Sequence, residues 1–290
     1  RSYSVTGVQT CALPICQTLK RAGIGYQITI LRQLETEYIA QIREEIILYN
    51  RFIIFSDFGT GQFNILKDQI NTEDILILDH HAPLEINEKP PDNHVNPYFF
   101  GFDGSYEISG AGICYLFAKT MDPNNIDMAS FAIIGALGDL QNKGEKGEFK
   151  GLNLIILQDA IKSGKMTTEL NLAISRSRPI TQAIAFTLPD RVPGLSGNEE
   201  AARLFLEKHQ IKVANSLNDP RTLLELSDLE RKTLNTALIQ YGLVEKKMSP
   251  EFVQKLITTF YILTDYDSKE PVADAREMSS LLNACGRSGH

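Results

Sequence analysis

An aspartate followed by two histidines, Asp79, His80 and His81, comes directly after the apolar run DILIL at residues 74–78. Such a run is typical of a strand that is buried on both faces of a parallel sheet. Because ligands of open α/β sheets bind beyond the carboxyl ends of the strands, we expect these three side chains in that crevice. Imidazole nitrogens and carboxylate oxygens together suit Mn²⁺, and carboxylates with water suit Mg²⁺. The sequence therefore predicts a divalent-metal site at this strand end.

Two more aspartates stand at comparable positions. Asp57 follows the apolar run RFIIFS at residues 51–56, and Asp139 follows the almost wholly apolar helix expected at residues 127–137. A single aspartate after a strand is most often a turn former or a helix cap, and two adjacent histidines can be a hydrogen-bonded loop pair. Carboxylates that converge, however, repel each other unless a cation lies between them. Convergence of Asp57, Asp79 and Asp139 would therefore itself require a metal ion.

Strand-like and helix-like segments alternate from residue 18 onwards. This order predicts an α/β domain over residues 16–164, in which a parallel sheet carries helices on both faces. Strands are expected at residues 26–31, 51–56 and 74–78. Helices are expected at residues 36–50, 111–120, 127–137 and 152–162. Residues 82–109 are rich in proline, asparagine and glycine, and loops of that length are usually functional or mobile.

The segments on either side of this domain are expected to differ from it. Residues 1–15 show no helical or alternating periodicity, and their string VTGVQTCALPI resembles the translation of a sequencing adapter, so we expect a non-native segment outside the fold. Residues 165–260 begin rich in proline, glycine and serine and continue with helical patterns, which predicts a linker with a helical extension. Residues 261–290 are expected to begin a truncated second α/β domain.

Composition excludes several classes of protein. The chain has 290 residues with 29 Lys+Arg against 36 Asp+Glu, a net charge of −7, which argues against a protein that coats DNA through a basic surface. Its four cysteines show no CxxC spacing, which argues against a disulfide framework and a zinc ribbon and predicts a reducing, cytoplasmic setting. No apolar run reaches the ~18 residues of a membrane-spanning helix, so no membrane partner is expected.

Several strings, in their order along the chain, resemble the DHH phosphoesterase superfamily. ILDHHAP resembles the motif that names the superfamily, FSDFGTGQ its second aspartate motif, and IIGALGDLQ its fourth motif. VNPYFFGFDGSYEISGAGICYLFAK, VPGLSGNEE and DAREMSSLLNACGR look most like the archaeal-type RecJ-like single-strand nucleases of this superfamily. The resemblance runs from about residue 18 to residue 290. It implies a Rossmann-like DHH domain and, at the end of the chain, the start of a DHHA1-type substrate-binding domain.

The resemblance implies a catalytic role for each residue that matches a motif. Asp57 would bridge two divalent ions, Mn²⁺ or Mg²⁺, and His80 and Asp139 would be further metal ligands. His81 would contact the scissile phosphate, and Asp79 would orient its neighbouring histidine from outside the ligand set. The paired ions would generate a nucleophilic hydroxide and neutralise charge on phosphorus, so that a phosphodiester bond is hydrolysed.

The implied substrate is single-stranded DNA or RNA, with proteins of the replication complex as further partners. In the DHHA1-like segment, Arg287 and Arg276 are candidates for phosphate contact, because guanidinium groups match the geometry of phosphate oxygens. The alternative is that both arginines are solvated charges on a helix face.

One motif of the superfamily is missing from the sequence. The first motif, of the form HxDxDG, is expected before the helix that ends in LKRAG, where residues 1–15 stand instead. A site for two ions built from Asp57, His80 and Asp139 alone would be under-coordinated. We therefore expect this chain to be a fragment that binds metal weakly and has little or no activity. Restoring the upstream motif is expected to restore Mn²⁺-dependent cleavage of a single strand.

Two other functions stay open. A small-substrate phosphohydrolase, such as a pyrophosphatase or an oligonucleotide or cyclic-dinucleotide phosphodiesterase, shares the same metal motifs. Such enzymes are usually compact, whereas roughly a hundred residues separate Gly164 from the DAREMSS segment, which favours the nuclease. A non-catalytic replication scaffold would keep the fold and lose the acids. The acidic and imidazole residues that are present argue against a scaffold.

Overall fold

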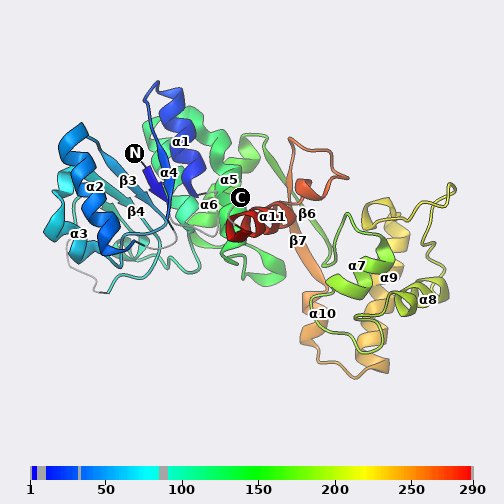
Figure 1. Cartoon of the computed structure of the whole chain (residues 1–290). Coiled ribbons are helices and arrows are strands. Elements are labelled where there is room, and N and C mark those ends of the chain that lie inside the picture. Colours follow the sequence, from blue (N-terminus) through cyan, green and yellow to red (C-terminus); the bar gives the residue numbers. More distant parts are fainter. Residues whose placement is uncertain (1, 5–10, 32–33, 85–90, 289–290) are drawn as a thin grey trace. The chain divides into compact units, whose positions relative to one another are not determined.

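The computed structural model describes residues 2–4, 11–31, 34–84 and 91–288 of the chain. The chain divides into two compact units (Figure 1). The first comprises residues 1–144, 149–167 and 275–290, and the second comprises residues 145–148 and 168–274. Each unit is described by itself.

A five-stranded parallel sheet forms the centre of the first unit. Its strands are β1 (Ser2–Ser4), β2 (Ile28–Ile30), β3 (Ile53–Ser56), β4 (Ile75–Leu78) and β5 (His94–Val95). The spatial order is β2-β1-β3-β4-β5, and every neighbouring pair is parallel. The register pairs Ile53 with Ile75 and Ser56 with Leu78, so β3 and β4 end at the same level. The residues that follow these two strands are therefore neighbours.

Helices cover both faces of this sheet. They are α1 (Ala12–Arg21), α2 (Thr36–Tyr49), α3 (Phe63–Gln69), α4 (Gly110–Met121), α5 (Ala129–Gly138), α6 (Gly151–Lys162) and α11 (Ala275–Ser288), with short helical turns at Thr72–Asp74, Pro97–Phe100 and Pro123–Met128. In Figure 1, α2 and α3 lie on one side of β3 and β4, and α4 contacts these strands from the other side. The expected α/β fold, a parallel sheet with helices on both faces, is confirmed.

The apolar runs of β3 and β4 explain this layering. All four residues of each strand are buried, as a strand between two helical layers requires. On one face, Phe55 and Ile77 join a core with Ile42 of α2 and Leu66 of α3. Full burial of each such side chain contributes roughly 1.5–3 kcal/mol. On the other side, α4 begins at Ser109, whose hydroxyl accepts from the Gly112 N–H at 3.1 Å.

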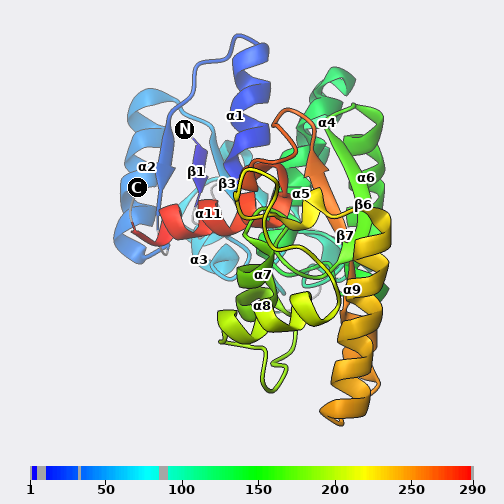
Figure 2. The same ribbon diagram turned by 90° about the vertical axis from the view of Figure 1, so that its right-hand side faces the viewer.

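The second unit has a core of its own. Strand β7 (Ile257–Leu263) pairs with β6 (Met166–Leu172), whose first two residues are assigned to the first unit. The helices are α7 (Ile180–Thr187), α8 (Glu199–Lys208), α9 (Asp228–Gln240) and α10 (Glu251–Lys255), with short helical turns at Glu145–Gly147, Leu223–Glu225, Tyr241–Glu245 and Pro271–Ala273. Helices α7 and α8 pack against each other (Figure 2). The core includes Ile184, Phe205, Leu234 and Phe252, all buried.

The structure differs from the expected division of the chain in three places. Residues 1–15 were expected outside the fold, but Ser2–Ser4 form β1 between β2 and β3, and α1 starts at Ala12. A three-residue strand is too short to show a periodic pattern, so only its backbone pairing reveals it. Most of residues 165–260, expected as a linker with a helical extension, fold into the compact second unit.

The third difference concerns the end of the chain. Residues 261–290 were expected to begin a separate domain, but they are shared between the units. Strand β7 belongs to the second unit, whereas α11 belongs to the first and packs against α5. Helix α11 continues to Ser288. Across the described part of the chain, none of the helices combines the length and the apolar character needed to cross a bilayer.

Candidate metal centre

Asp57 follows β3 at the point where the chain leaves the sheet. Its N–H donates to the carbonyl oxygen of Leu78 at 2.8 Å, so the residue still joins the strand ladder. Its φ of 70° lies in the left-handed region, which aspartate tolerates better than most residues other than glycine. The carboxylate lies against Gly110, the first residue of α4, at a position that a Cβ would occupy. Asp57 is thus held between the end of a strand and the start of a helix.

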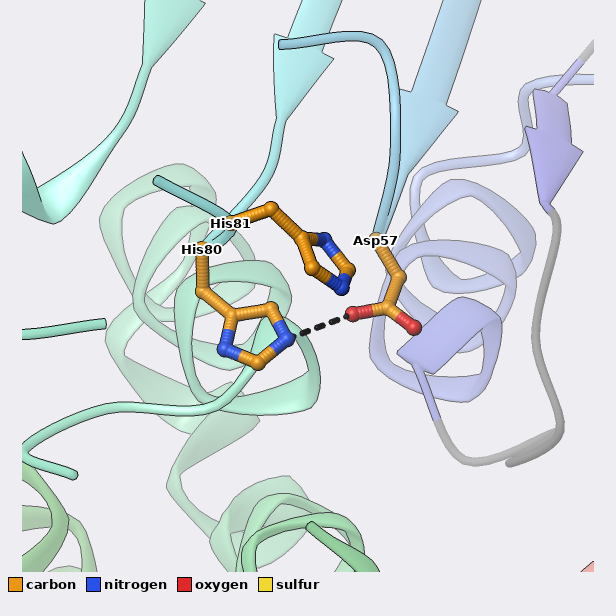
Figure 3. A group of neighbouring side chains, drawn as sticks. All are labelled: Asp57, His80 and His81. Carbon is orange, nitrogen blue, oxygen red and sulfur yellow. Dashed lines mark ion pairs between the residues drawn. The ribbon is translucent and has the colours of Figure 1, made fainter. Parts of the chain in front are cut away.

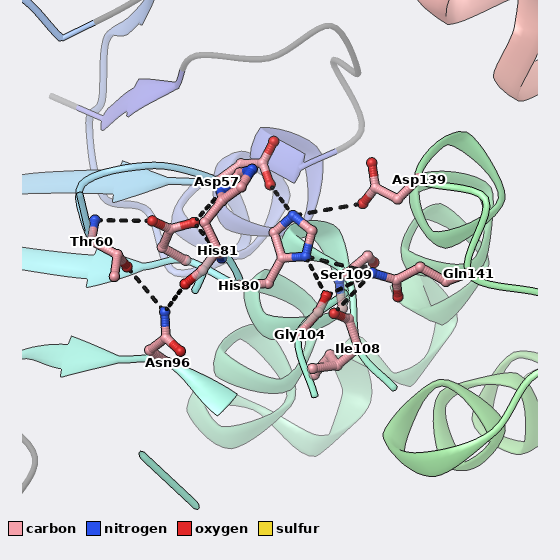
Figure 4. Close-up of polar contacts among 12 residues, drawn as sticks. Asp57, Thr60, His80, His81, Asn96, Gly104, Ile108, Ser109, Asp139 and Gln141 are labelled. Carbon is pink, nitrogen blue, oxygen red and sulfur yellow. Dashed lines mark hydrogen bonds and ion pairs between the residues drawn. The ribbon is translucent and has the colours of Figure 1, made fainter. Parts of the chain in front are cut away.

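The His80 ring lies between two carboxylates. Its Nε2 is 3.2 Å from Oδ1 of Asp57 and 3.9 Å from Oδ2 of Asp139, the residue that ends α5. Its Nδ1 is 2.7 Å from the carbonyl oxygen of Gly104, which can only accept, so Nδ1 carries a proton and donates. This bond fixes the ring with Nε2 facing both carboxylates (Figure 4). The structure thus brings His80 next to Asp57 and Asp139, the residues that the resemblance implies as metal ligands.

His81 is fixed by the aspartate two positions before it. Its Nδ1 and its backbone N–H lie 2.7 and 3.2 Å from Oδ1 of Asp79. Since a carboxylate accepts, Nδ1 carries the proton, and the other ring nitrogen points toward Asp57 (Figure 3). The side chain of His81 is 61% exposed and that of Asp79 is 1% exposed. Asp79 therefore contacts a neighbouring histidine from a buried position, while His81 is accessible to a ligand.

Hydrogen bonds set the charges of Asp79 and His81. Burial by itself raises the pKa of Asp79, but the bonds from His81 and Thr60 outweigh it and lower the pKa to about 2. The bond to Asp79 raises the pKa of His81, against the opposing effect of burial. Asp79 is therefore a carboxylate at neutral pH and favours a positively charged His81.

Negative charge is concentrated around His80. Burial lowers the pKa of His80, but the contact with Asp57, its charge and that of Asp139 outweigh burial and raise this pKa to about 9. Burial, followed by the negative charge of Asp57, raises the pKa of Asp139 to about 6. The position between these carboxylates therefore favours a cation. Without a metal ion, protonation of His80 supplies a positive charge there.

The donor atoms fit a divalent metal ion. One ligand atom each from Asp57, His80 and His81 lies within 4.8 Å of the others. Oδ1 of Asp57 is buried without a properly directed hydrogen bond from the described residues, which is a costly state for a carboxylate oxygen. Both histidines donate Nδ1–H to an oxygen, the arrangement that metal-ligating histidines usually show. Of the expected ligands, Asp139 reaches only His80 at 3.9 Å, and His81, expected at the phosphate, completes the group of three.

Thr60 and Asn96, which sequence analysis did not single out, hold the segment that carries the two histidines. The Thr60 N–H donates to Oδ2 of Asp79 at 2.9 Å, and Nδ2 of Asn96 donates to the carbonyl oxygen of His81 at 2.9 Å. Both residues stand inside strings that resemble the family, FSDFGTGQ and VNPYFF, which was the only signal available.

A second pair of polar side chains supports His80 from the other side. Nε2 of Gln141 donates to the carbonyl oxygen of Gly104 at 2.8 Å, the same oxygen that His80 contacts. Oε1 of Gln141 accepts from Nδ2 of Asn153 at 2.6 Å, and both side chains are buried. Gln141 lies two residues after Asp139, so the α5 terminus supplies both a carboxylate and a support for the imidazole.

The two expected phosphate-binding arginines lie on α11. Arg276 is partly buried in the first turn of this helix, and the backbone of Arg287 is helical near its end, with a side chain outside the described part of the structure. Because α11 packs against α5, it lies beside the helix that ends at Asp139. Contact of Arg276 and Arg287 with phosphate stays a prediction.

Replacing Asp79 with asparagine is expected to lower the pKa of His81. The substitution removes the negative charge that favours the protonated ring, while the amide keeps an acceptor for the Thr60 N–H. Affinity for Mn²⁺ is expected to fall about 10- to 100-fold, as is usual when a carboxylate behind a metal-ligating histidine is lost. An NMR titration of His81 and calorimetric Mn²⁺ binding measure both effects. Asp127→Asn, which removes a surface carboxylate paired with Arg21, is the matched control and should change neither.

His94 makes stability depend on pH between about 4 and 6.5. His94 is only 4% exposed, and burial lowers its pKa to about 4. The unfolded chain therefore binds a proton at mildly acidic pH that the folded chain does not, so stability is lost as pH falls from 6.5 toward 4. Between pH 7 and pH 5, we expect His94 to lower the free energy of unfolding by about 2 kcal/mol. Urea unfolding at both pH values should show a smaller loss in His94→Gln, and equal losses in both proteins would contradict the prediction.

Comparisons with known proteins agree with this fold. The sequence model of the DHH-CID domain matches residues 175–257, within the second unit. The uncharacterized protein MJ0831 of Methanocaldococcus jannaschii is 30% identical over 281 residues, which cover 95% of this chain and 57% of that protein. CDC45 from Entamoeba histolytica has a similar fold, with a TM-score of 0.64 over 98% of this chain and 59% of that chain, at 12% sequence identity.

The chain thus spans less than two thirds of the length of either of these proteins. The likeness to CDC45 covers the first unit, with its parallel sheet, as well as the second, where the domain match lies. Residues 175–257 thus match a domain of the DHH superfamily, and the chain shares its fold with CDC45.

Proposed function

We propose that this site performs metal-dependent hydrolysis of phosphodiester bonds in single-stranded DNA or RNA, in the manner of a RecJ-like exonuclease. The observation that carries the proposal is the group formed by Asp57, His80 and His81, whose ligand atoms lie within 4.8 Å of one another beyond the ends of two neighbouring parallel strands. The exposed imidazole of His81 lies next to the carboxylate of Asp57. A negatively charged phosphate group could reach a cation bound there.

The residues of the chain divide the work in this proposal. Asp57 and His80 would hold the cation, with Asp139 as a further carboxylate on the far side of His80. A bound Mn²⁺ or Mg²⁺ would supply Lewis-acid chemistry that activates water and neutralises charge on phosphorus. His81, whose pKa is raised by its bond to Asp79, holds a proton and attracts the scissile phosphate. Asp79 keeps that ring in one orientation.

The test measures cleavage and metal binding on the same protein. The chain, in excess over a 5′-labelled single-stranded oligonucleotide, is incubated with Mn²⁺, and products are separated over hours. We expect slow, stepwise shortening that EDTA stops, because the described side chains offer few ligands for two ions. His80→Ala should bind Mn²⁺ less tightly and give no products. Products of equal amount from His80→Ala, or Mn²⁺ binding without any product, would overturn the proposal.

The two alternatives predict different results in the same assays. A small-substrate phosphohydrolase would release phosphate from pyrophosphate, or cleave a dinucleotide, faster than it shortens a long strand. A scaffold for replication-complex proteins is favoured by one observation, the architecture shared with CDC45 over nearly the whole chain. A scaffold would bind its protein partners equally well before and after His80→Ala, and it would release no products.

A further inference from the structure

We propose that His94 is a positioning residue of this centre, which acts through the hydroxyl group of Thr60 to hold His81 in its working orientation. The geometric part of the inference stands on the contacts of the folded chain. Its catalytic consequence rests on the proposed function.

His94 is built into the layer directly behind the metal centre. It lies on β5, and its ring packs between Phe63 and Phe99, with ring centroids 4.9 and 5.1 Å away. Its Nε2 lies 3.0 Å from Oγ1 of Thr60, inside the protein. The two aromatic contacts leave the imidazole little freedom to rotate, so its acceptor atom is held at a fixed place.

The hydrogen bonds of the Thr60 hydroxyl favour one tautomer of His94. Oγ1 of Thr60 accepts from Nδ2 of Asn96 at 3.0 Å, so its own proton is available to donate. Nε2 of His94 can accept the hydroxyl proton of Thr60 only when Nε2 itself carries no proton. The proton of the neutral ring is then on Nδ1. Burial lowers the pKa of His94 and keeps the ring neutral at physiological pH, as this arrangement requires. This arrangement leaves Nδ1 of His94 buried without a hydrogen-bond partner among the described residues, while the reverse tautomer would leave the Thr60 proton without this acceptor.

Thr60 connects this anchor to His81 by two routes. Its backbone N–H holds Oδ2 of Asp79, whose Oδ1 accepts from Nδ1 of the His81 ring. Its hydroxyl accepts from Asn96, whose same amide nitrogen donates to the carbonyl oxygen of His81. One route therefore fixes the ring of His81 and the other fixes its backbone. Functional side chains must be held within about 0.5 Å and 10–20° of the productive geometry, so loss of this anchor is expected to reach the centre.

The experiment compares two substitutions of His94 that differ in hydrogen bonding. His94→Gln can place an amide oxygen near Oγ1 of Thr60, whereas His94→Leu keeps apolar volume and removes the acceptor. Thr60→Val removes the hydroxyl while His94 stays in place. Phe99→Leu, which changes packing against the same ring without touching the hydrogen bonds, is the matched control. Each variant is examined by ¹⁵N NMR of histidine side chains without metal, and by single-strand cleavage with Mn²⁺.

We expect the Nδ1–H signal of a His81 ring hydrogen-bonded to Asp79 in the wild type, in His94→Gln and in Phe99→Leu, and a weakened or lost signal in His94→Leu and Thr60→Val. The cleavage rate should fall about tenfold in the last two, with the double variant no slower than either single one. An unchanged His81 spectrum in Thr60→Val would overturn the inference even if His94→Leu fails to fold. Absence of cleavage by the wild type would contradict the proposed function, while the NMR comparison would still decide the role of His94.

Discussion

Replacing His80 with alanine is expected to weaken Mn²⁺ binding at least about 100-fold and to reduce cleavage about 1000-fold, to the metal-free background. His80 contacts both Asp57 and Asp139, at 3.2 and 3.9 Å. Its removal takes away a ligand and also leaves Asp57 and Asp139 without the imidazole that lies between them. Isothermal calorimetry with Mn²⁺ and the labelled-strand assay measure the two losses.

The control for this substitution is His209→Ala. His209 follows α8 in the second unit, where its ring contacts Phe205, so its replacement removes an imidazole that lies far along the chain from the centre. It should leave Mn²⁺ affinity and cleavage within about twofold of the wild type. Equal losses in both variants would mean that the Mn²⁺ bound to the chain is not held by His80.

Replacing Gly110 with alanine is expected to impair the centre through a single methyl group. A Cβ at this position would lie 2.0 Å from Oδ1 of Asp57 and 2.8 Å from its Cγ, so the carboxylate must move. A displacement of about 1 Å is enough to cost about 100-fold in rate when a reacting group is misplaced. Because alanine favours a helix more than glycine does, α4 itself should not be destabilised. Mn²⁺ affinity, cleavage rate and the melting temperature are measured together.

Gly61→Ala is the matched control for Gly110→Ala. Gly61 lies between β3 and α3, and a Cβ there would meet no atom within 4 Å. The same added methyl group should therefore leave metal binding and cleavage unchanged. If Gly110→Ala binds Mn²⁺ as the wild type does, the carboxylate of Asp57 is not part of the metal site.

The central part of the fold could be predicted because its signals are local. Continuous apolar runs identified β3 and β4, and the helix expected at residues 111–120 corresponds to α4, which the hydroxyl of Ser109 caps. The pattern failed for β1, whose three residues carry no period, and for the second unit, whose proline and glycine-rich start concealed a compact core. Burial of that core depends on contacts between residues far apart in the sequence, which composition does not report.

The sequence by itself determined which groups this protein offers: the aspartate after β3, the Asp-His-His string after β4 and the aspartate at the end of α5. Strand ends in parallel sheets and the order of the elements were enough to bring them to one edge. Only the tertiary structure decided how each group is held, from the Gly104 carbonyl that orients His80 to the His94 and Thr60 pair behind His81. The reason is physical: hydrogen bonds that orient a side chain depend on the positions of atoms to within tenths of an ångström, and these positions are set by packing of the whole unit.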